Sequence, residues 1–184
     1  MPLRSIQLEK AAPEALEAVI AFYDDVIKNT PDIASTARWR IGSHPTEEGL
    51  KTSIQEGDLY VCRENGVIIG AMVLPMHQGE DYHPVAWKED LPDDQVASVH
   101  LLGVKPDRQG TGVASALVRE AIALARANGM KALRLDTLAS NLPAQHLYES
   151  LGFSFRGKLH GYAENTGWFD FFFYEFTDLG VNRP

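Results

Sequence analysis

Two glycines stand directly before a run of apolar residues in the stretch VKPDRQGTGVASALV, Val104–Val118. Gly110 and Gly112 can adopt backbone conformations with positive φ and let the chain come close to a ligand. The apolar spacing that follows predicts a helix beginning at Val113. Because the first N–H groups of a helix have no partner within it, this point can bind an anion such as a phosphate. The alternative, in which the glycines only form a tight turn, stays open.

Two widespread phosphate-binding motifs do not fit this loop. A P-loop requires Lys and then Ser or Thr after the second glycine, whereas Val113 and Ala114 follow Gly112. A dinucleotide fingerprint requires a third glycine where this chain has Ser115. What remains is the pattern Gln109-x-x-Gly112-x-Ala114 between a predicted strand and an amphipathic helix.

A second constellation lies downstream in NLPAQHLYESLGF, Asn141–Phe153, where a predicted helix ends at Gly152. Together with the glycine loop, this stretch resembles the two signatures of the GNAT superfamily of acyl-CoA-dependent N-acyltransferases. The two occur in the same order as in the family, and the resemblance is clearest from Val96 to Phe153. It implies that acetyl-CoA is the cosubstrate and that a primary amine attacks the thioester directly in a ternary complex.

The resemblance also assigns the residues that would bind the cosubstrate. Backbone N–H groups of the loop would bind the pyrophosphate, and the preceding strand would bind the pantetheine arm, with an N–H near Leu102 polarising the thioester carbonyl. Leu101, Leu102 and Val104 can also be plain core residues, and both roles can hold because backbone and side chain face different partners. Asn141 can equally be a bare helix cap. Lys105 and Arg108 either add positive charge or lie on a solvated surface. The residues assigned to binding are Leu102, Gly103, Val104, Gln109, Gly110, Thr111, Gly112, Val113, Ala114, Asn141 and Tyr148.

The family places a tyrosine at the position of Tyr148 as the general acid for the departing thiolate. A phenol has a pKa of about 10 and a thiol about 8.5, so full proton transfer from an ordinary tyrosine would be uphill by roughly 2 kcal/mol. Tyr148 therefore either has a lowered pKa or mainly donates a hydrogen bond to the developing charge.

The proton acceptor is less clearly marked, because the strand before the loop carries no carboxylate. Regular alternation would place Ser98, His100 and Leu102 on one face of that strand. An imidazole titrates near pH 6.5, so His100 is the catalytic base that the sequence offers. A core histidine bonded to the backbone is the competing interpretation. A water chain could also lead to a carboxylate of the neighbouring loop: Glu80, Asp81 or Asp94.

The elements that would position these residues form a mixed pattern of strands and helices. A strand–helix–strand unit favours parallel pairing of Val99–Val104 with Leu133–Leu138. The fold class expected is α/β (α+β), with a mixed central sheet and helices on both faces. The resemblance implies one GNAT-like domain over residues 1–184, whose sheet is splayed to admit CoA. Strands are predicted at 5–9, 96–104, 131–139, 153–159 and 168–176, a hairpin at 58–75, helices from Pro13 and over 44–57, 113–127 and 140–152, and a long loop at 75–95.

The amino-acid composition limits the classes of partner and the cellular location that can be expected. The 184 residues carry a net charge of −8, which argues against nucleic acid. Cys62 is the one cysteine, so no intrachain disulfide can form and a reducing, cytoplasmic location is expected. No leader, membrane span or metal-binding set of residues is expected.

The acceptor is expected to be a small-molecule amine. Its identity is not readable, although several residues are candidates for the wall of its site: Trp39, Glu80, Asp81, Tyr82, Trp87 and Tyr162. A longer acyl group or a hydroxyl acceptor stays open. The rival function is a non-catalytic acyl-CoA-binding domain, which would not need an acid at Tyr148. The aromatic segment WFDFFFYEF, 168–176, suits burial in a sheet or in a homodimer interface.

Overall fold

The structure is a computed structural model that describes residues 6–164 and 167–180. The chain divides into two compact units, residues 1–74 with 101–118 and residues 75–100 with 119–184. Strand β4 (Val96–Val104) and helix α4 (Val113–Ala127) contribute residues to both. The hydrogen-bonded strand order is β1-β2-β3-β4-β5-β7-β6, a mixed seven-stranded sheet that is not closed, as expected from the sequence.

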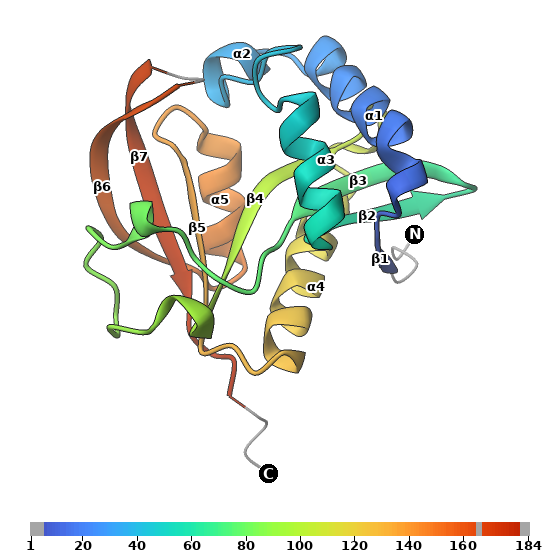
Figure 1. The fold of residues 1–184 in the computed structure, drawn as a ribbon. Coiled ribbons are helices and arrows are strands. Elements are labelled where there is room, and N and C mark those ends of the chain that lie inside the picture. Colours follow the sequence, from blue (N-terminus) through green and yellow to red (C-terminus); the bar gives the residue numbers. More distant parts are fainter. Residues whose placement is uncertain (1–5, 165–166, 181–184) are drawn as a thin grey trace. The chain divides into compact units, whose positions relative to one another are not determined.

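The first unit contains the antiparallel hairpin predicted from the sequence. Its turn is Asn65-Gly66, with φ of 51° and 79°, the conformation that a two-residue hairpin loop requires. Helix α1 and the shorter α3 lie beside the three antiparallel strands of this unit (Figure 1). The elements are β1 (Leu8–Lys10), α1 (Leu16–Asn29), α2 (Ile33–Thr36), α3 (Glu47–Glu56), β2 (Leu59–Glu64) and β3 (Val67–Val73).

Both faces of this hairpin are buried, each against different helices. Val61 and Ile68 belong to a core cluster with residues of α1 and α3. Their neighbours Cys62 and Ile69 belong to a second cluster, which also contains Val113 and Leu117 of α4. Successive residues of a strand point to opposite faces, so the helices lie on both faces of this part of the sheet. Burial raises the pKa of the Cys62 thiol to about 11, which suits a core residue.

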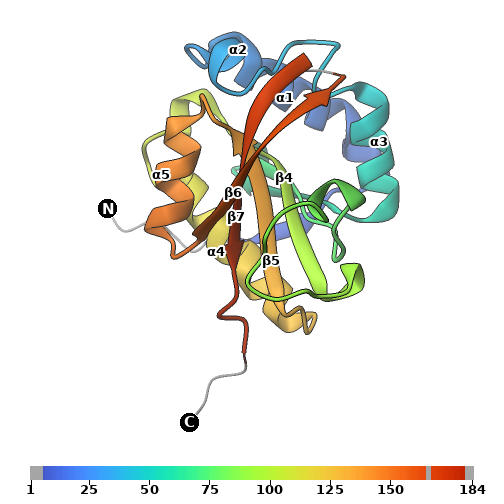
Figure 2. The same cartoon turned by 90° about the vertical axis from the view of Figure 1, so that its left-hand side faces the viewer.

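The second unit pairs the beginning of β4 with β5 in parallel, β5 with β7 antiparallel, and β7 with β6 antiparallel. Strands β6 and β7 form a long pair, and helix α5 contacts β6 (Figure 2). Strand β7 lies between β5 and β6, so both of its hydrogen-bonding edges are paired. Of its side chains, those of Phe173, Tyr174 and Glu175 are buried, whereas Trp168 is exposed, and a homodimer interface at this segment stays a prediction. The elements are β5 (Ala132–Leu138), α5 (Leu142–Ser150), β6 (Ser154–Ala163) and β7 (Gly167–Phe176).

The parallel ladder between β4 and β5 is shorter than the sequence predicted. It pairs Val96 through Val99 with Ala132 through Leu135 and ends there, although β4 continues to Val104. The reason lies in the strand itself: Leu101 has a φ of +52°, in the left-handed region, which interrupts regular strand geometry. The predicted parallel pairing of the two strands is confirmed, but its register is different, because Val99 pairs with Leu135 and not with Leu133.

Other predicted boundaries differ by a few residues. The first strand, predicted at 5–9, is Leu8–Lys10; its first predicted residue, Ser5, lies outside the described residues. The strand predicted at 153–159 continues to Ala163. The segment 75–95 has only single turns of 3-10 helix, at Glu80–Tyr82 and Asp93–Gln95, as the prediction of a loop required. Within residues 6–164 and 167–180, no helix is long and apolar enough to span a membrane.

Candidate active site

The glycine loop lies in the first unit, between a 3-10 turn at Pro106–Arg108 and the start of α4. Gly110 and Gly112 have φ of +73° and +92°, so both need the freedom of glycine. The first bond within the helix runs from Ala116 N to Gly112 O at 3.0 Å. The N–H groups of residues 113–115 precede it and have no partner within the helix, so they can bind an anion.

Side chains of the loop turn back to hold its backbone. Thr111 Oγ1 donates to Arg108 O at 2.6 Å. Gln109 Nε2 donates to Val104 O at 3.2 Å and to Thr30 Oγ1 at 2.8 Å. The polar side chains thus fix the conformation of the loop. The backbone N–H groups at the start of α4 can then bind a phosphate.

The two cations near the loop are paired with carboxylates. Arg108 bonds Glu64 Oε2 at 2.7 Å, and Glu64 raises the pKa of the Arg108 guanidinium. Lys105 Nζ lies 3.1 Å from Asp107 and 3.7 Å from Asp25. Their carboxylate partners offset much of the positive potential that these side chains could give the loop. The positive end of the α4 helix dipole is then the main attraction for an anion.

The strand before the loop combines core side chains with an irregular backbone. The side chains of Leu102 and Val104 belong to the cluster around Cys62, so their interpretation as core residues holds. At Gly103, an added Cβ would lie 3.3 Å from ring carbons of both Phe22 and Tyr23. The backbone of this segment is therefore packed closely against α1 and fixed in position.

The second unit holds Asn141 and Tyr148, one at the start of α5 and the other near its end. Asn141 caps the helix, its Oδ1 accepting from Ala144 N at 3.2 Å, as a bare cap would. Tyr148 is 6% exposed and packs against the rings of Phe153 and Tyr174.

The pKa of Tyr148 lies above the usual range, first because the phenol is buried and then because of the negative charge of Asp136. Both effects act against the first of the two alternatives from the sequence, a lowered pKa. A neutral phenol that donates a hydrogen bond is what this environment favours.

His100, also in the second unit, is already part of a hydrogen-bonded chain. Ser98 Oγ donates its single proton to His77 O at 2.9 Å, so at 3.0 Å it must accept from His100 Nε2. This assigns the proton of the neutral imidazole to Nε2 and leaves Nδ1 as the acceptor nitrogen. The partner is a side-chain hydroxyl and not the backbone atom that the competing interpretation named.

A carboxylate that sequence reasoning missed lies on β5. Asp136 Oδ1 accepts from Tyr82 Oη at 2.6 Å. Tyr82, which the sequence suggested as a wall of the acceptor site, is fully buried, and its ring lies edge-on to that of His100 at 6.1 Å. Asp136 Oδ2 makes no hydrogen bond with the described residues, so this oxygen can receive a proton or bind a cation.

The loop 75–95 is fastened to the sheet by a buried ion pair. Arg134 on β5 and Glu175 on β7 are 1% and 0% exposed, with their charged atoms 3.0 Å apart. Arg134 also donates to Gln78 Oε1 at 2.8 Å and to Glu89 O at 2.9 Å, and its guanidinium stacks on Trp87 at 4.2 Å. Arg134 therefore holds groups of the loop as well as Glu175, and Glu175 accepts from Lys88 N of the loop at 3.2 Å.

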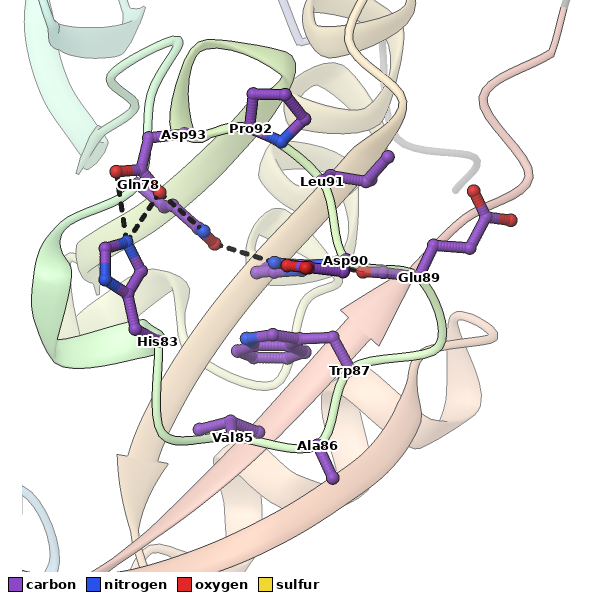
Figure 3. Close-up of a pocket in the computed structure, with 11 residues that line it drawn as sticks. Gln78, His83, Val85, Ala86, Trp87, Glu89, Asp90, Leu91, Pro92 and Asp93 are labelled. Carbon is purple, nitrogen blue, oxygen red and sulfur yellow. Dashed lines mark hydrogen bonds and ion pairs between the residues drawn. The ribbon is translucent and has the colours of Figure 1, made fainter.

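Beside this anchor lies a pocket of about 600 Å³ (Figure 3). Figure 3 shows His83, Asp93 and Gln78 joined by hydrogen bonds along one wall. The pKa of the Asp93 carboxyl group lies below its usual range because the group accepts hydrogen bonds from Gln78 and His83. Because these polar groups are already hydrogen-bonded to one another, we interpret them as stabilising the loop and not as a ligand-binding set.

The chain is similar to known proteins over most of its length. The family model described as acetyltransferase (GNAT) family matches residues 18–153. A mycothiol acetyltransferase from Cellulomonas flavigena is 26% identical over 126 residues, 62% of this chain and 35% of the relative. The chain thus spans well under half the length of that curated relative.

Solved structures agree in fold. An acetyltransferase of the GNAT family from Streptococcus agalactiae has a TM-score of 0.75 at 17% identity, covering 94% of this chain and 95% of its own. YncA from Salmonella typhimurium, solved with its cofactor acetyl-CoA, has a TM-score of 0.69 at 18% identity and covers 98% of both chains. The chain belongs to the acetyltransferase (GNAT) family. Acetyl-CoA is the cosubstrate of that family.

Proposed function

We propose that the protein transfers the acetyl group of acetyl-CoA to a primary amine by direct attack in a ternary complex. The observation that carries this is the loop Gln109–Ala114, whose two glycines have positive φ and lead into α4. An added Cβ at Gly110 would meet nothing within 4 Å, so the loop surface is open there. A loop of small residues at a helix start fits a pyrophosphate.

The residues proposed to hold acetyl-CoA are those that the resemblance assigns: Leu102, Gly103, Val104, Gln109–Ala114, Asn141 and Tyr148. Bound there, acetyl-CoA would supply the activated thioester. The N–H of Leu102 would donate to the thioester oxygen as negative charge develops on it. Tyr148, kept protonated by burial, would donate to the sulfur.

The amine must lose a proton, and two groups of the second unit can accept it. His100 offers Nδ1, since Nε2 is committed to Ser98. Asp136 offers Oδ2, with its other oxygen fixed by Tyr82. We propose His100 as the base that the sequence indicates and Asp136 as the rival that the hydrogen bonding favours. A carboxylate would also attract the substrate as an ammonium ion.

We propose that residues 1–184 act as one domain, in the cytoplasm, on a small-molecule amine. The family match from 18 to 153 runs through both units, which supports a single domain. The rival function, an acyl-CoA-binding domain without catalysis, would keep the loop but would not need the buried phenol of Tyr148.

The test combines calorimetric titration with acetyl-CoA and release of free CoA thiol in the presence of a panel of primary amines. Binding with thiol release is expected; binding without release would favour the non-catalytic rival. Gly112→Asp would put a side chain and a negative charge against the pyrophosphate and should abolish binding. Gly129→Asp, at the other end of α4 with a similar φ of +73°, is the matched control and should bind normally. Equal affinity in both variants would reject the site.

A further inference from the structure

The phenol of Tyr23 on helix α1 is tied to the irregular point of strand β4. Tyr23 is 1% exposed, and its Oη donates to Leu101 O at 2.7 Å. Its ring packs edge-on against Phe22 at 5.1 Å and Trp39 at 5.7 Å. Three aromatic side chains thus hold one buried hydroxyl against one backbone carbonyl, and that hydroxyl is satisfied, as burial requires.

The carbonyl that accepts from Tyr23 belongs to Leu101, whose backbone conformation is energetically unfavourable. Leu101 has a φ of +52°, in the left-handed region, where the Cβ of a non-glycine residue comes too close to the following carbonyl oxygen. Such a conformation persists only where the surrounding structure enforces it. The hydrogen bond from Tyr23 to Leu101 O is one such restraint, and it acts on the irregular residue itself.

The oxygen of Leu101 and the nitrogen of Leu102 belong to the same peptide group. That group is planar, so fixing the direction of the C=O fixes the direction of the N–H, which points the opposite way. A hydrogen bond accepted by the carbonyl also polarises the amide and strengthens the N–H as a donor.

We propose that Tyr23 is a positioning residue that holds and polarises the Leu101–Leu102 peptide, so that the Leu102 N–H is aimed at the thioester oxygen before reaction. The proposal rests on the proposed function and adds a residue to its site. Donors that are oriented in advance need no reorganisation when charge develops. Tyr23 itself does not touch the substrate.

Gly103 extends the same contact along the strand. Any side chain there would come within 3.3 Å of the Phe22 and Tyr23 rings, closer than an ordinary van der Waals contact. Helix α1 therefore packs on the backbone that follows the peptide as well as bonding to its carbonyl. The peptide is thus held by a hydrogen bond to its own carbonyl and by aromatic rings packed on the residue that follows it.

The test is Tyr23→Phe, which removes Oη and keeps the ring. In the protein without ligand, the amide proton of Leu102 should move to higher field and exchange faster with solvent, because the peptide is less polarised and less restrained. With acetyl-CoA, affinity should change little while kcat falls about tenfold, less than the 10²–10³-fold typical of deleting an oxyanion donor outright.

Val19→Ala is the control for a merely structural role, because Val19 is a fully buried core residue of the same helix. It should lower the melting temperature without moving the Leu102 amide or kcat. An unchanged Leu102 amide and kcat in Tyr23→Phe, or an equal loss of kcat in Val19→Ala, overturns the proposal. Absence of acetyl-CoA binding in the wild type removes the proposed function and this inference with it; binding and turnover that survive Tyr23→Phe remove the inference alone.

Discussion

The phenol oxygen of Tyr82 lies 2.6 Å from Oδ1 of Asp136. One residue comes from the long loop 75–95 and the other from the middle of β5, 54 positions later. Burial, followed by the negative charge of Asp136, raises the pKa of Tyr82 well above its usual value, so the phenol is the donor and the carboxylate the acceptor. The loop thereby fixes the direction of a half-buried carboxylate in the unit that also holds His100 and Tyr148.

Asp136→Asn distinguishes the two proposed bases. An amide cannot accept the proton of an ammonium ion, so if Asp136 is the base, kcat should fall by about 10²–10⁴-fold. His100→Gln would then lose far less. The measurement is kcat and kcat/KM for both variants with the best amine of the panel.

Tyr82→Phe is the companion variant, since it frees Asp136 Oδ1 without removing the carboxylate. It should give an effect smaller than that of Asp136→Asn. A large loss in His100→Gln with full activity in Asp136→Asn would return the role of base to the imidazole. Full activity in both single variants would eliminate both candidates.

Tyr148→Phe should lower turnover far more than it weakens acetyl-CoA binding. The phenol is needed when negative charge develops on sulfur, so its loss appears in the rate. A Phe ring keeps the packing against Phe153 and Tyr174. The measurement is single-turnover kinetics alongside calorimetry, and a wild-type rate of the chemical step in this variant would contradict the role.

The glycine loop and the helix carrying Tyr148 were predictable because local chemistry specifies them. Gly110 and Gly112 need positive φ, Asn141 supplies a cap, and apolar residues recur at helical spacing. Each signal lies within a few residues of the element it forms. The hairpin around Asn65-Gly66 was predictable for the same reason.

The contacts of Asp136, Arg134 and Tyr23 could not be predicted in this way, because their partners lie 41 to 78 positions away in sequence. The sequence did contain a signal for the contacts of Arg134 and Asp136. In LRLDTL, charged residues at 134 and 136 alternate with leucines in a predicted strand, which indicates one face with polar partners. Nothing in the sequence marks Leu101 as the residue with positive φ.

The buried tyrosines predict how stability depends on pH. Burial holds the pKa values of Tyr23, Tyr82 and Tyr148 above 10 in the native protein, whereas in the unfolded chain they return to about 10. The folded state then binds more protons than the unfolded state above about pH 10. The free energy of unfolding should therefore be constant with respect to these groups below that pH and fall above it.

Tyrosinate absorbance provides the measurement. Some of the six tyrosines should titrate in the native protein only as it unfolds, and all six near pH 10 in urea. Removing one buried phenol, as in Tyr148→Phe, should make the decline of stability at high pH less steep. Complete ionisation of all six tyrosines near pH 10 in a folded protein would contradict the burial of these phenols.

Arg134→Met tests the anchor of the loop 75–95. The substitution leaves the carboxylate of Glu175, which is 0% exposed, with Arg156 and the Lys88 N–H as its remaining partners. Breaking a buried ion pair from one side typically costs about 3–5 kcal/mol, so the melting temperature should fall clearly. Lys158→Met is the control, because its ion pair with Asp170 is exposed and its loss should change stability little.

The same variant separates anchoring from simple stabilisation. Arg134 bonds Gln78 and the Glu89 carbonyl, so its loss should release the loop 75–95. This loop contains Tyr82, which bonds Asp136. Below the melting transition, the fluorescence of Trp87 should then change, because the guanidinium that stacks on it is gone. KM for the amine should rise while acetyl-CoA affinity stays near the wild-type value, since Arg134 bonds Glu175, Gln78 and Glu89, which are not among the residues proposed to hold acetyl-CoA. A variant that is destabilised but keeps the wild-type KM for the amine would show that Arg134 stabilises the unit without ordering the acceptor loop.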